Sequence, residues 1–581
     1  MRKTKIICTL GPATDDRETL KQVILGGMNV ARFNFSHGDH AQHLNRLNLL
    51  RELCDELHAP VAALLDTKGP EVRLKNFEGG AALLEEGQLF TLTSEEVAGT
   101  AEKCTVTYKG LAADVTVGTT ILLDDGLIEL KVEAIDKNDV ICRILNGGRI
   151  SDHKGVNVPG VSLNMPYISK QDREDILFGI EQDFDFIAAS FVSSAKDILQ
   201  VRSILDANKG GHIKIIAKIE NGAGINNIDE IIAASDGIMV ARGDMGVEIN
   251  FADIPIIQKN IIWHCYNMGK PAITATQMLD SMTQNPRPTR AEITDVANAI
   301  YDGTSAIMLS GETAAGKHPV EAVCTMANIA EHTEMDINYN KRLRLREIEN
   351  HLGVADAMAH AACTTAMDIK ASAIITTTRS GETARLLCKY RPAQPIIACV
   401  TTHHVARQLA LSWGITPLLM PMVKTTDEMI DVSVETARKA GYVKDGDMVV
   451  LTAGVPVGIP GTTNMLKAHL VGDALISGVG VGAQIVSGKL CVCHTAEEVH
   501  ANLKDGDVLV IAATNNDMLA DLRRASAIVT EAPGTNSHAA VVGLTLGKPV
   551  IVGATGATVR LKNHTLVSVD PKHGIVQVMP S

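Results

Sequence analysis

The 581-residue sequence has few aromatic residues, no excess of basic residues and no long apolar run. Because only 3% of its residues are aromatic, Ile, Val, Leu, Ala and Met must fill the cores. The formal charge of -13 argues against a surface that binds nucleic acid or an anionic membrane, since both need basic patches. We therefore expect no nucleic-acid or membrane partner, and any phosphate site must be local.

No stretch approaches the roughly 20 consecutive apolar residues of a membrane-spanning helix. The apolar run in the start MRKTKIICTLGP is too short for a signal peptide. The 11 cysteines are odd in number and scattered, which is not typical of a disulfide framework. These features predict a cytoplasmic protein. Cys491 and Cys493, followed by His494, could bind a metal ion, but a CxC on an alternating strand is more often part of a core.

The length is too great for one hydrophobic core and predicts three to five domains. Residues 1–70 hold three strand-like runs, KIICTLG, NVARFNFS and VAALLDT, and residues 167–345 hold five, each followed by a helical pattern. Eight βα units predict a TIM (β/α)8 barrel. Hairpin signals such as Asp125-Gly126 predict that residues 71–166 form a small inserted β-barrel domain, a lid.

Two further domains follow the expected barrel. ASAIITTT, QPIIACV and DMVVLTAG predict an open α/β regulatory domain over residues 346–473. A glycine-rich hinge, SGVGVG, introduces an extra C-terminal domain, residues 474–581.

Polar residues close six of the expected barrel strands, where TIM-barrel enzymes place their chemistry. Strand termination alone explains one or two such positions but poorly explains six. The residues are Asn34 and Ser36, Asp66 and Thr67, Lys218 and Glu220, Asp244, Thr276 and Gln277, and Ser310 and Glu312.

Lys218 and Glu220 lie two positions apart on one strand, so both side chains point into the barrel mouth. With Asp244 they offer two carboxylates, the usual protein contribution to a Mg²⁺–phosphate site. The alternative interpretation is a salt-bridged barrel interior. The arginines of RFNFSHG and LLDTKGPEVR suit phosphate, whereas the neutral oxygens of these motifs suit a large monovalent cation.

Seven motifs in residues 1–473 resemble those of the pyruvate kinase family in the family's order: RFNFSHG, LLDTKGPEVR, KGVNVPG, IAKIENGAGINNIDEI, VARGDMGVE, TATQMLDSM and NPRPTRAEITDVANAIYDGTSAIMLSGETAAG. The resemblance implies transfer of phosphate from phosphoenolpyruvate to ADP, giving pyruvate and ATP in the last step of glycolysis. It also implies Mg²⁺ (or Mn²⁺) and K⁺ as cofactors, K⁺ being favoured by Glu71, and a homotetramer.

The resemblance also assigns residue roles. Lys218, Thr276 and Arg32 would be catalytic, and Arg32, Gly243, Asp244 and Thr276 would bind the substrate. Asn34, His37, Arg73 and Lys154 would bind the nucleotide, although His37 could equally brace its turn. K⁺ would be held by Asn34, Ser36, Asp66 and Thr67, and Mg²⁺ by Glu220 and Asp244.

TTTRSGETAR, residues 376–385, combines hydroxyls, glycine and arginine in a strand-to-helix turn, which favours either a phosphate cradle or an ordinary capped helix start. It resembles the family's allosteric effector loop. A small phosphorylated effector would then contact Thr376, Thr378, Ser380, Thr383 and Arg385.

The tail motif TEAPGTNSHAAVVGLTLGKPVIVG resembles the swivelling phosphohistidine domain of phosphoenolpyruvate-using phosphotransferases, with His538 at the phosphorylated position. The nucleotide-grasp domain of those enzymes has no visible counterpart, and Pro533-Gly534 replaces the usual double glycine. A structural or regulatory tail is therefore favoured.

The sequence leaves three alternatives open. A phosphoenolpyruvate synthase or dikinase-like phosphotransferase would work through phospho-His538. A carbon–carbon lyase would use a metal-bound enolate without a nucleotide, and Lys154 on the insert argues against it. A non-enzymatic metabolite sensor would require an incapacitated barrel, which the motifs do not indicate.

Overall fold

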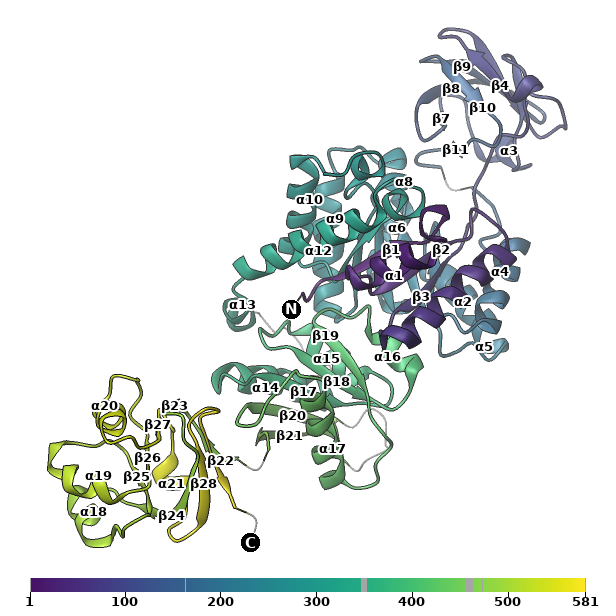
Figure 1. Ribbon diagram of the computed structural model, residues 1–581. Coiled ribbons are helices and arrows are strands. Elements are labelled where there is room, and N and C mark those ends of the chain that lie inside the picture. The colour runs from purple at the N-terminus through teal and green to yellow at the C-terminus, as the bar shows by residue number, and fades with distance from the viewer. Residues whose placement is uncertain (1, 162, 346–352, 456–462, 473, 580–581) are drawn as a thin grey trace. The chain divides into compact units, whose positions relative to one another are not determined.

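A computed structural model describes residues 2–161, 163–345, 353–455, 463–472 and 474–579 (Figure 1). The chain divides into two compact units, one of Met1–Tyr339 with Thr402–Pro417 and the other of Asn340–Thr401 with Leu418–Ser581. The predicted domain boundaries at residues 346 and 473 fall on positions outside the described residues.

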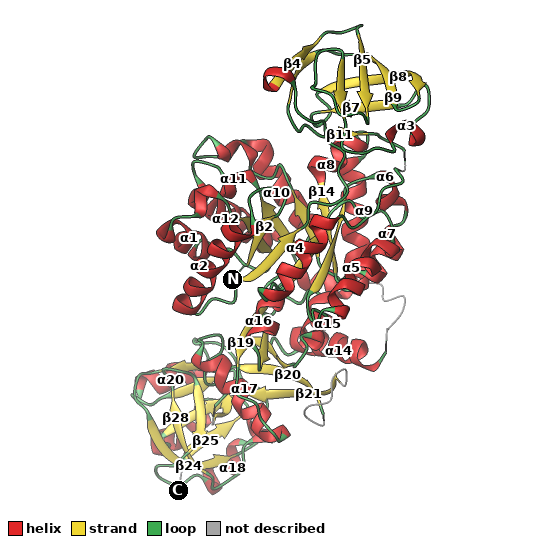
Figure 2. Cartoon of the chain, turned by 90° about the vertical axis from the view of Figure 1, so that its right-hand side faces the viewer, coloured by secondary structure: helices red, strands yellow, loops and turns green. Residues whose placement is uncertain are grey.

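Eight parallel strands close into a barrel in the first unit, which confirms the predicted fold class (Figure 2). The strand order is β1-β16-β15-β14-β13-β12-β3-β2. The strands are β1 (Lys5–Thr9), β2 (Val30–Asn34), β3 (Ala62–Asp66), β12 (Phe186–Ala189), β13 (Lys214–Ile219), β14 (Gly237–Ala241), β15 (Ala272–Ala275) and β16 (Ala306–Leu309).

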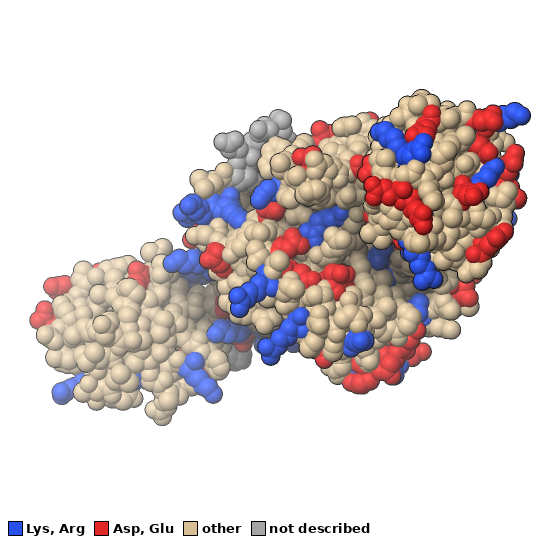
Figure 3. Space-filling view, turned by 90° about the horizontal axis from the view of Figure 1, so that it is seen from above, with Lys and Arg blue, Asp and Glu red and all other residues tan. Residues whose placement is uncertain are grey.

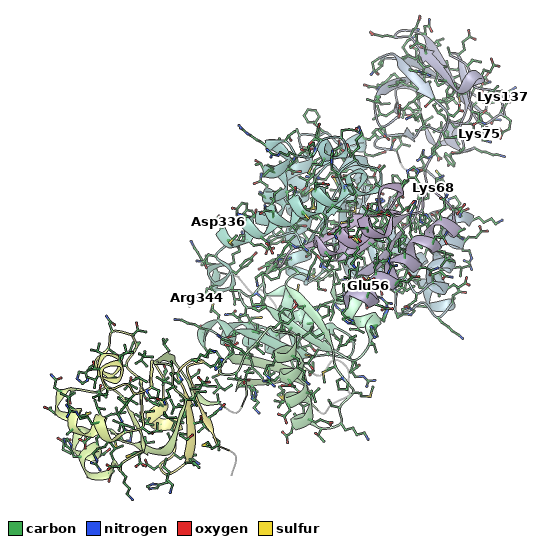
Figure 4. All side chains as sticks on the ribbon, in the orientation of Figure 1. Glu56, Lys68, Lys75, Lys137, Asp336 and Arg344 are labelled. Carbon is green, nitrogen blue, oxygen red and sulfur yellow. The ribbon has the colours of Figure 1, made fainter. Side chains whose placement is uncertain are left out.

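Helices follow these strands and pack around the barrel. Arg17 and Lys21 of α1 form exposed ion pairs with Glu56 of α2, which is labelled in Figure 4. The helices are α1 (Arg17–Leu25), α2 (His40–Leu57), α4 (Lys170–Glu181), α5 (Ala195–Ala207), α6 (Gly222–Asn226), α7 (Ile228–Ala234), α8 (Arg242–Glu248), α9 (Ile254–Met268), α10 (Arg290–Asp302), α11 (Gly311–Ala314) and α12 (Pro319–Asp336). The next helix along the chain, α13 (Tyr339–Leu345), lies almost wholly in the second unit. Short 3-10 helices are η1 (Pro12–Thr14), η2 (Glu78–Gly80), η3 (Asp280–Thr283) and η4 (Asn516–Met518).

The barrel interior is filled as the scarcity of aromatic residues requires. Its core cluster contains Ile7, Leu64, Ile216, Met239 and other aliphatic or methionine side chains, with Phe186 as its one aromatic member. Burial of such side chains is the main force that closes the barrel.

The segment between β3 and α4 is all β apart from two short helical turns, η2 and α3 (Leu111–Asp114). The β7–β8 hairpin turns through Asp124, Asp125 and Gly126, all at positive φ, as the Asp-Gly signal predicts. A six-stranded sheet has the order β11-β7-β8-β9-β5-β6, and β10 pairs with β4. The strands are β4 (Ala81–Leu84), β5 (Leu89–Thr93), β6 (Lys103–Thr105), β7 (Thr120–Leu123), β8 (Ile128–Asp136), β9 (Asp139–Ile144), β10 (Gly148–Ser151) and β11 (Val156–Asn157).

A five-stranded sheet of order β19-β18-β17-β20-β21 follows, with β21 antiparallel to β20. Its strands are β17 (Ala373–Thr377), β18 (Ile396–Val400), β19 (Ile415–Leu419), β20 (Met448–Gly454) and β21 (Thr463–Leu470). The helices along this part of the chain are α14 (Val354–Asp368), α15 (Glu382–Lys389), α16 (His403–Leu409) and α17 (Thr426–Lys439), of which α16 belongs to the first compact unit.

The C-terminal part is an eight-stranded sheet of order β22-β29-β28-β24-β25-β26-β27-β23. Its strands are β22 (Ala474–Ser477), β23 (Val479–Val481), β24 (Val486–Val492), β25 (Val508–Ile511), β26 (Ala527–Thr530), β27 (Val550–Val552), β28 (Leu566–Asp570) and β29 (Ile575–Val578). Its helices are α18 (Ala496–Asn502), α19 (Leu519–Arg524), α20 (His538–Thr545) and α21 (Ala557–Arg560).

All 11 cysteines have free thiols, as the sequence predicts. Cys491 and Cys493 lie buried in the core of the C-terminal part, with their Sγ atoms 3.6 Å apart. No helix in the described part of the chain is long and apolar enough to cross a membrane. Figure 3 shows Lys and Arg side chains interspersed with Asp and Glu over the face that it presents.

Candidate active site

A compact cluster of four buried charges lies at the carboxyl ends of β2, β3 and β13. The Nζ atom of Lys218 lies 3.0 Å from Asp66 Oδ1 and 2.9 Å from Glu220 Oε1. Arg32 Nε donates a hydrogen bond of 2.6 Å to the other oxygen of Asp66. None of the four side chains is more than 11% exposed. Two cations therefore balance two carboxylates in a site with little access to water.

These contacts fix the charge state of Lys218 and Asp66. Burial alone would lower the pKa of Lys218, but the carboxylates of Asp66 and Glu220 outweigh it and raise the pKa above its ordinary value. Burial likewise works to raise the pKa of Asp66, but Arg32 and Lys218 hold it below its usual range. Lys218 is thus a fixed positive charge at the barrel mouth.

Glu220 differs from Asp66 because it has one cation beside it instead of two. Burial raises its pKa to about 7, Lys218 works against that rise, and the carboxylate of Asp244 adds to it. The backbone N–H of Phe191 donates to Glu220 Oε2 at 2.6 Å. Burial destabilises the ionised form of this carboxylate, and a second cation beside it would stabilise that form. This electrostatic environment is the one expected for a metal ligand.

Ser190, directly after β12, ties the cluster to its neighbours. Its hydroxyl accepts from Lys218 Nζ at 2.7 Å and donates to the carbonyl of Thr67 at 2.6 Å. Its carbonyl accepts from Tyr167 Oη at 3.0 Å. Ser190 was not among the residues predicted from the sequence. The selection of polar residues at strand ends would also have found it, at the end of the run FDFIAASFV.

The ends of β14 and β15 are joined by hydrogen bonds to Thr276. The backbone N–H of Gly243 donates to Thr276 Oγ1 at 2.7 Å, and Arg242 donates to the carbonyl of Thr276 at 2.7 Å. Thr276 and Gln277 both have positive φ, 67° and 53°. Such a conformation costs non-glycine residues roughly 1–3 kcal/mol and is concentrated at functional sites. Asp244 follows in the first turn of α8.

The predicted K⁺ ligands lie at the ends of two adjacent strands. The register pairs Asn34 of β2 with Asp66 of β3, and Thr67 follows directly. Asn34 Oδ1 accepts from the backbone N–H of Ser36 at 3.1 Å, and Thr67 Oγ1 donates to the carbonyl of Ala188 at 3.3 Å. Neutral oxygens with one carboxylate form a donor set that fits a large monovalent cation.

Other strand-end residues have structural partners. Glu312 is buried and accepts from the backbone N–H groups of Leu279 and Ser310 at 3.0 and 2.7 Å. His37 is exposed, and its carbonyl contacts His43 Nε2 at 2.9 Å.

Arg73 and Lys154 are engaged away from the charge cluster. Arg73 pairs with Glu71 at 2.7 Å and also donates to the carbonyl of His153. Lys154 Nζ lies 2.8 Å from Asp124 Oδ1 in the β7–β8 turn. Lys68, labelled in Figure 4, belongs to the segment that leads from β3 toward these residues.

The segment 376–385 forms the expected turn between β17 and α15. Gly381 has a φ of 80°, and its N–H donates to Thr378 Oγ1 at 3.1 Å. Arg385 donates to the carbonyl of Ser380, and Thr383 contacts the hydroxyl of Thr463 at 2.7 Å. Among the residues that the structure describes, Thr376 Oγ1 is buried without a hydrogen-bond partner.

His538 begins α20, and both of its ring nitrogens have partners. Nδ1 lies 2.8 Å from Thr514 Oγ1 and Nε2 lies 3.0 Å from Asn516 Oδ1. Ser537 caps the helix by accepting from the backbone N–H of Ala540.

Three families match consecutive parts of the chain: the barrel domain of pyruvate kinase at residues 1–323, its alpha/beta domain at 356–469, and the mobile domain of PEP-utilising enzymes at 503–574. The pyruvate kinase of Geobacillus stearothermophilus is 52% identical over 577 residues, which cover 99% of this chain and 98% of that protein. The pyruvate kinase of Bacillus licheniformis is 49% identical over 578 residues, 99% of each chain. A crystal structure of a pyruvate kinase from Cryptosporidium parvum superposes with a TM-score of 0.77 and 40% identity, covering 81% of this chain and 96% of that one.

Proposed function

The chain belongs to the pyruvate kinase family, and from this premise we propose how its barrel residues carry out the reaction. The protein is a phosphotransferase that moves phosphate from phosphoenolpyruvate to ADP and yields pyruvate and ATP. The observation that carries the residue assignment is the buried cluster of Lys218, Asp66 and Glu220 at the strand ends.

Lys218 stabilises the charge that moves during the reaction. The bond between phosphorus and the enol oxygen breaks, a bond to a β-phosphate oxygen of ADP forms, and an electron pair stays on the enolate oxygen. Such a transfer needs positioning and charge neutralisation more than covalent help from the protein. The pKa of Lys218, raised by Asp66 and Glu220 against the effect of burial, keeps this positive charge in place throughout. Arg32, held by Asp66, adds a second cation for the phosphoryl group.

The enolate then takes a proton at its methylene carbon. Thr276 organises the water that delivers it, and the contact between its hydroxyl and the N–H of Gly243 holds the two strand ends that border the substrate carboxylate. Gly243, Asp244 and Thr276 thus form the substrate side of the site.

Glu220 and Asp244 hold Mg²⁺ or Mn²⁺. Two carboxylates are the donor chemistry that suits such an ion. Burial, with a smaller effect from the carboxylate of Asp244, raises the pKa of Glu220 to about 7, so a cation beside it stabilises its ionised form. The bound ion supplies charge neutralisation to phosphate and enolate oxygens.

K⁺ is held by Asn34, Ser36, Asp66 and Thr67. The test is pyruvate formation with Mg²⁺ in buffers that contain either K⁺ or only Na⁺ or tetramethylammonium. Stimulation by K⁺ is expected, and full activity without K⁺ would refute this assignment.

Asn34, His37, Arg73 and Lys154 bind the nucleotide. Arg73 and Lys154 exchange their partners Glu71 and Asp124 for phosphate oxygens when the lid closes, because a phosphate carries more charge than one carboxylate.

The remaining parts are regulatory or structural. A small phosphorylated effector binds at the turn between β17 and α15, where it contacts Thr376, Thr378, Ser380, Thr383 and Arg385. The buried hydroxyl of Thr376, which has no hydrogen-bond partner among the described residues, supports a ligand there. The tail is regulatory or structural: curated pyruvate kinases match this chain over 98% or more of their own length, which disfavours a dikinase working through phospho-His538.

We place the enzyme in the cytoplasm as a homotetramer.

A further inference from the structure

Three potential metal ligands meet at the end of the barrel opposite the catalytic site. Asp183 precedes β12 and His212 precedes β13, so both lie at the amino ends of their strands. His404 lies in the first turn of α16, which packs against this end in the same compact unit. One ligand atom from each residue lies within 4.8 Å of the others.

The separations fit a metal ion after small side-chain rotations. His212 Nε2 lies 3.7 Å from Asp183 Oδ1, and the rings of His212 and His404 meet edge to face with centroids 4.7 Å apart. Zinc binds nitrogen and carboxylate oxygen at about 2.0–2.2 Å in tetrahedral geometry, which places ligand atoms roughly 3.3 Å from one another. The three ligand atoms therefore need to approach one another by about 1.5 Å at most.

The surroundings of His404 point independently to a ligand. In the part of the chain that the structure describes, its Nδ1 atom is buried without a hydrogen-bond partner, although Asp185 Oδ1 lies only 3.6 Å away. Asp185 is fully buried and is fixed by the N–H of Ala63 at 2.8 Å. A histidine that binds a metal through one nitrogen commonly directs the other at a carboxylate. Coordination through Nε2 would place the Nδ1 proton toward Asp185.

The local charges favour an ion that accepts nitrogen ligands. Arg407 pairs with Asp183 Oδ2 at 2.6 Å and with Asp185 at 2.8 Å, and Arg51 lies 3.6 Å from Asp185. Two arginines thus balance two carboxylates and leave Asp183 Oδ1 available. Mg²⁺ and Ca²⁺ prefer sites rich in oxygen and negative charge, whereas two imidazoles and one carboxylate suit Zn²⁺ and its neighbours in the first transition row.

We propose that Asp183, His212 and His404 form a binding site for a divalent transition-metal ion of the zinc class, distinct from the catalytic metal site. Asp183 and His212 are partly exposed, so water can occupy the fourth coordination position. The ion links α16 to the amino-terminal rim of the barrel, and the proposal does not depend on the residue assignments made for catalysis.

The test is titration of the metal-free, full-length protein with Zn²⁺ by calorimetry, in excess Mg²⁺ that occupies the carboxylate site at the barrel mouth. We compare wild type with His212→Asn, His404→Asn and the control His264→Asn. His264 also contacts an aspartate, Asp229, at 2.6 Å from a barrel helix, but it is not part of the three-residue group. Wild type and His264→Asn should bind one Zn²⁺ per chain tightly, and the other two variants should bind it at least about 10-fold more weakly.

Thermal unfolding separates loss of the ion from loss of the fold. In chelator, all four proteins should unfold at similar temperatures. Zn²⁺ should raise the Tm of wild type and His264→Asn and have little effect on the cluster variants, because only a ligand bound to the native state stabilises it. If His404→Asn unfolds in chelator, the Zn²⁺ affinities and Tm values of His212→Asn and Asp183→Asn test the proposal instead. Absence of tight Zn²⁺ binding in wild type, or unchanged affinity in His212→Asn, would overturn the proposal.

Discussion

At the scale of single residues, the site depends on buried charges that balance one another. The ion pairs of Lys218 contribute little net stability, since removing charges from water costs about as much as their attraction returns. Their effect is to keep Lys218 protonated and Glu220 close to its titration point. Removal of one partner leaves the other charge buried and unpaired, which costs about 3–5 kcal/mol, so each substitution here needs a measurement of folding beside that of activity.

Glu220 should couple Mg²⁺ binding to proton release. Burial raises its pKa to about 7, so an ion that needs the ionised carboxylate displaces a proton below that pH. We expect Mg²⁺ affinity to fall as the pH decreases through about 7 and to approach a loss of about tenfold per pH unit. Calorimetric titration in buffers of different ionisation heat measures the released proton. Glu220→Gln should bind Mg²⁺ more weakly and release no proton, and equal release from this variant would contradict the assignment.

Ser190 should act as a positioning residue for Lys218. Ser190→Ala removes the hydroxyl that accepts from Lys218 and donates to Thr67, which should lower kcat about 10-fold and stability by about 1–3 kcal/mol. The KM for phosphoenolpyruvate should change little, because the hydroxyl is directed at the lysine. Ser193→Ala is the matched control from the same loop, and its hydroxyl contacts Asn221 at 3.1 Å instead. Steady-state kinetics that show equal effects for both variants would contradict this role.

The charged residues at the strand ends could be predicted because parallel barrel strands converge at one rim. Lys218 and Glu220 lie two positions apart at the end of β13, and Asp66 ends β3 in register with Asn34 of β2. The same strand-end rule applied to the run FDFIAASFV also selects Ser190, which was not among the predicted residues. The partners of Arg73 and Lys154 could not be predicted, since they depend on how Glu71 and the Asp124 turn fold in space.

At the scale of elements, the loop after β15 combines strain with function. Thr276 and Gln277 both occupy the left-handed region, and the hydroxyl of Thr276 holds the N–H of Gly243 beyond β14. This bond joins the ends of β14 and β15, which we propose border the substrate. The turn is stabilised by the surrounding contacts, not by its own residues.

Thr276→Ala should therefore affect proton transfer more than folding. We expect exchange of the pyruvate methyl protons with heavy water, followed by NMR, to slow by about 10²-fold, because water is no longer organised at the carbon. Stability should change by less than about 1 kcal/mol, since the side chain is half-buried. Thr276→Ser keeps the hydroxyl and should restore most of the exchange. An unchanged exchange rate in Thr276→Ala would show that another group protonates the enolate.

The strands were more predictable than the place of α16. Alternation and Asp-Gly signals locate the barrel strands and the β7–β8 hairpin, because both are local patterns. The ion pairs of Arg407 with Asp183 and Asp185 join residues more than 200 positions apart. One sequence contains no local signal for such a pair, so the proximity of Asp183, His212 and His404 could be found only from the structure.

At the scale of the whole molecule, catalysis and the C-terminal tail should be separable. Both ring nitrogens of His538 are engaged by Thr514 and Asn516, which is the arrangement of a side chain that braces its helix. His538→Ala, and a chain that ends before residue 474, should both retain kcat within about twofold in the absence of effectors, since neither change touches the barrel. Loss of turnover in His538→Ala would instead support the dikinase-like alternative.

The central claim is that Lys218 at the barrel mouth carries phosphoryl transfer from phosphoenolpyruvate to ADP. The most direct measurement is pyruvate formation with Mg²⁺ and K⁺ by wild type and Lys218→Ala, with circular dichroism to show that both are folded. We predict that the variant loses about 10³-fold or more in kcat, because Arg32 alone does not supply the positive charge that we assign to Lys218 at the transferred group. A folded Lys218→Ala protein with turnover near that of wild type would contradict the account.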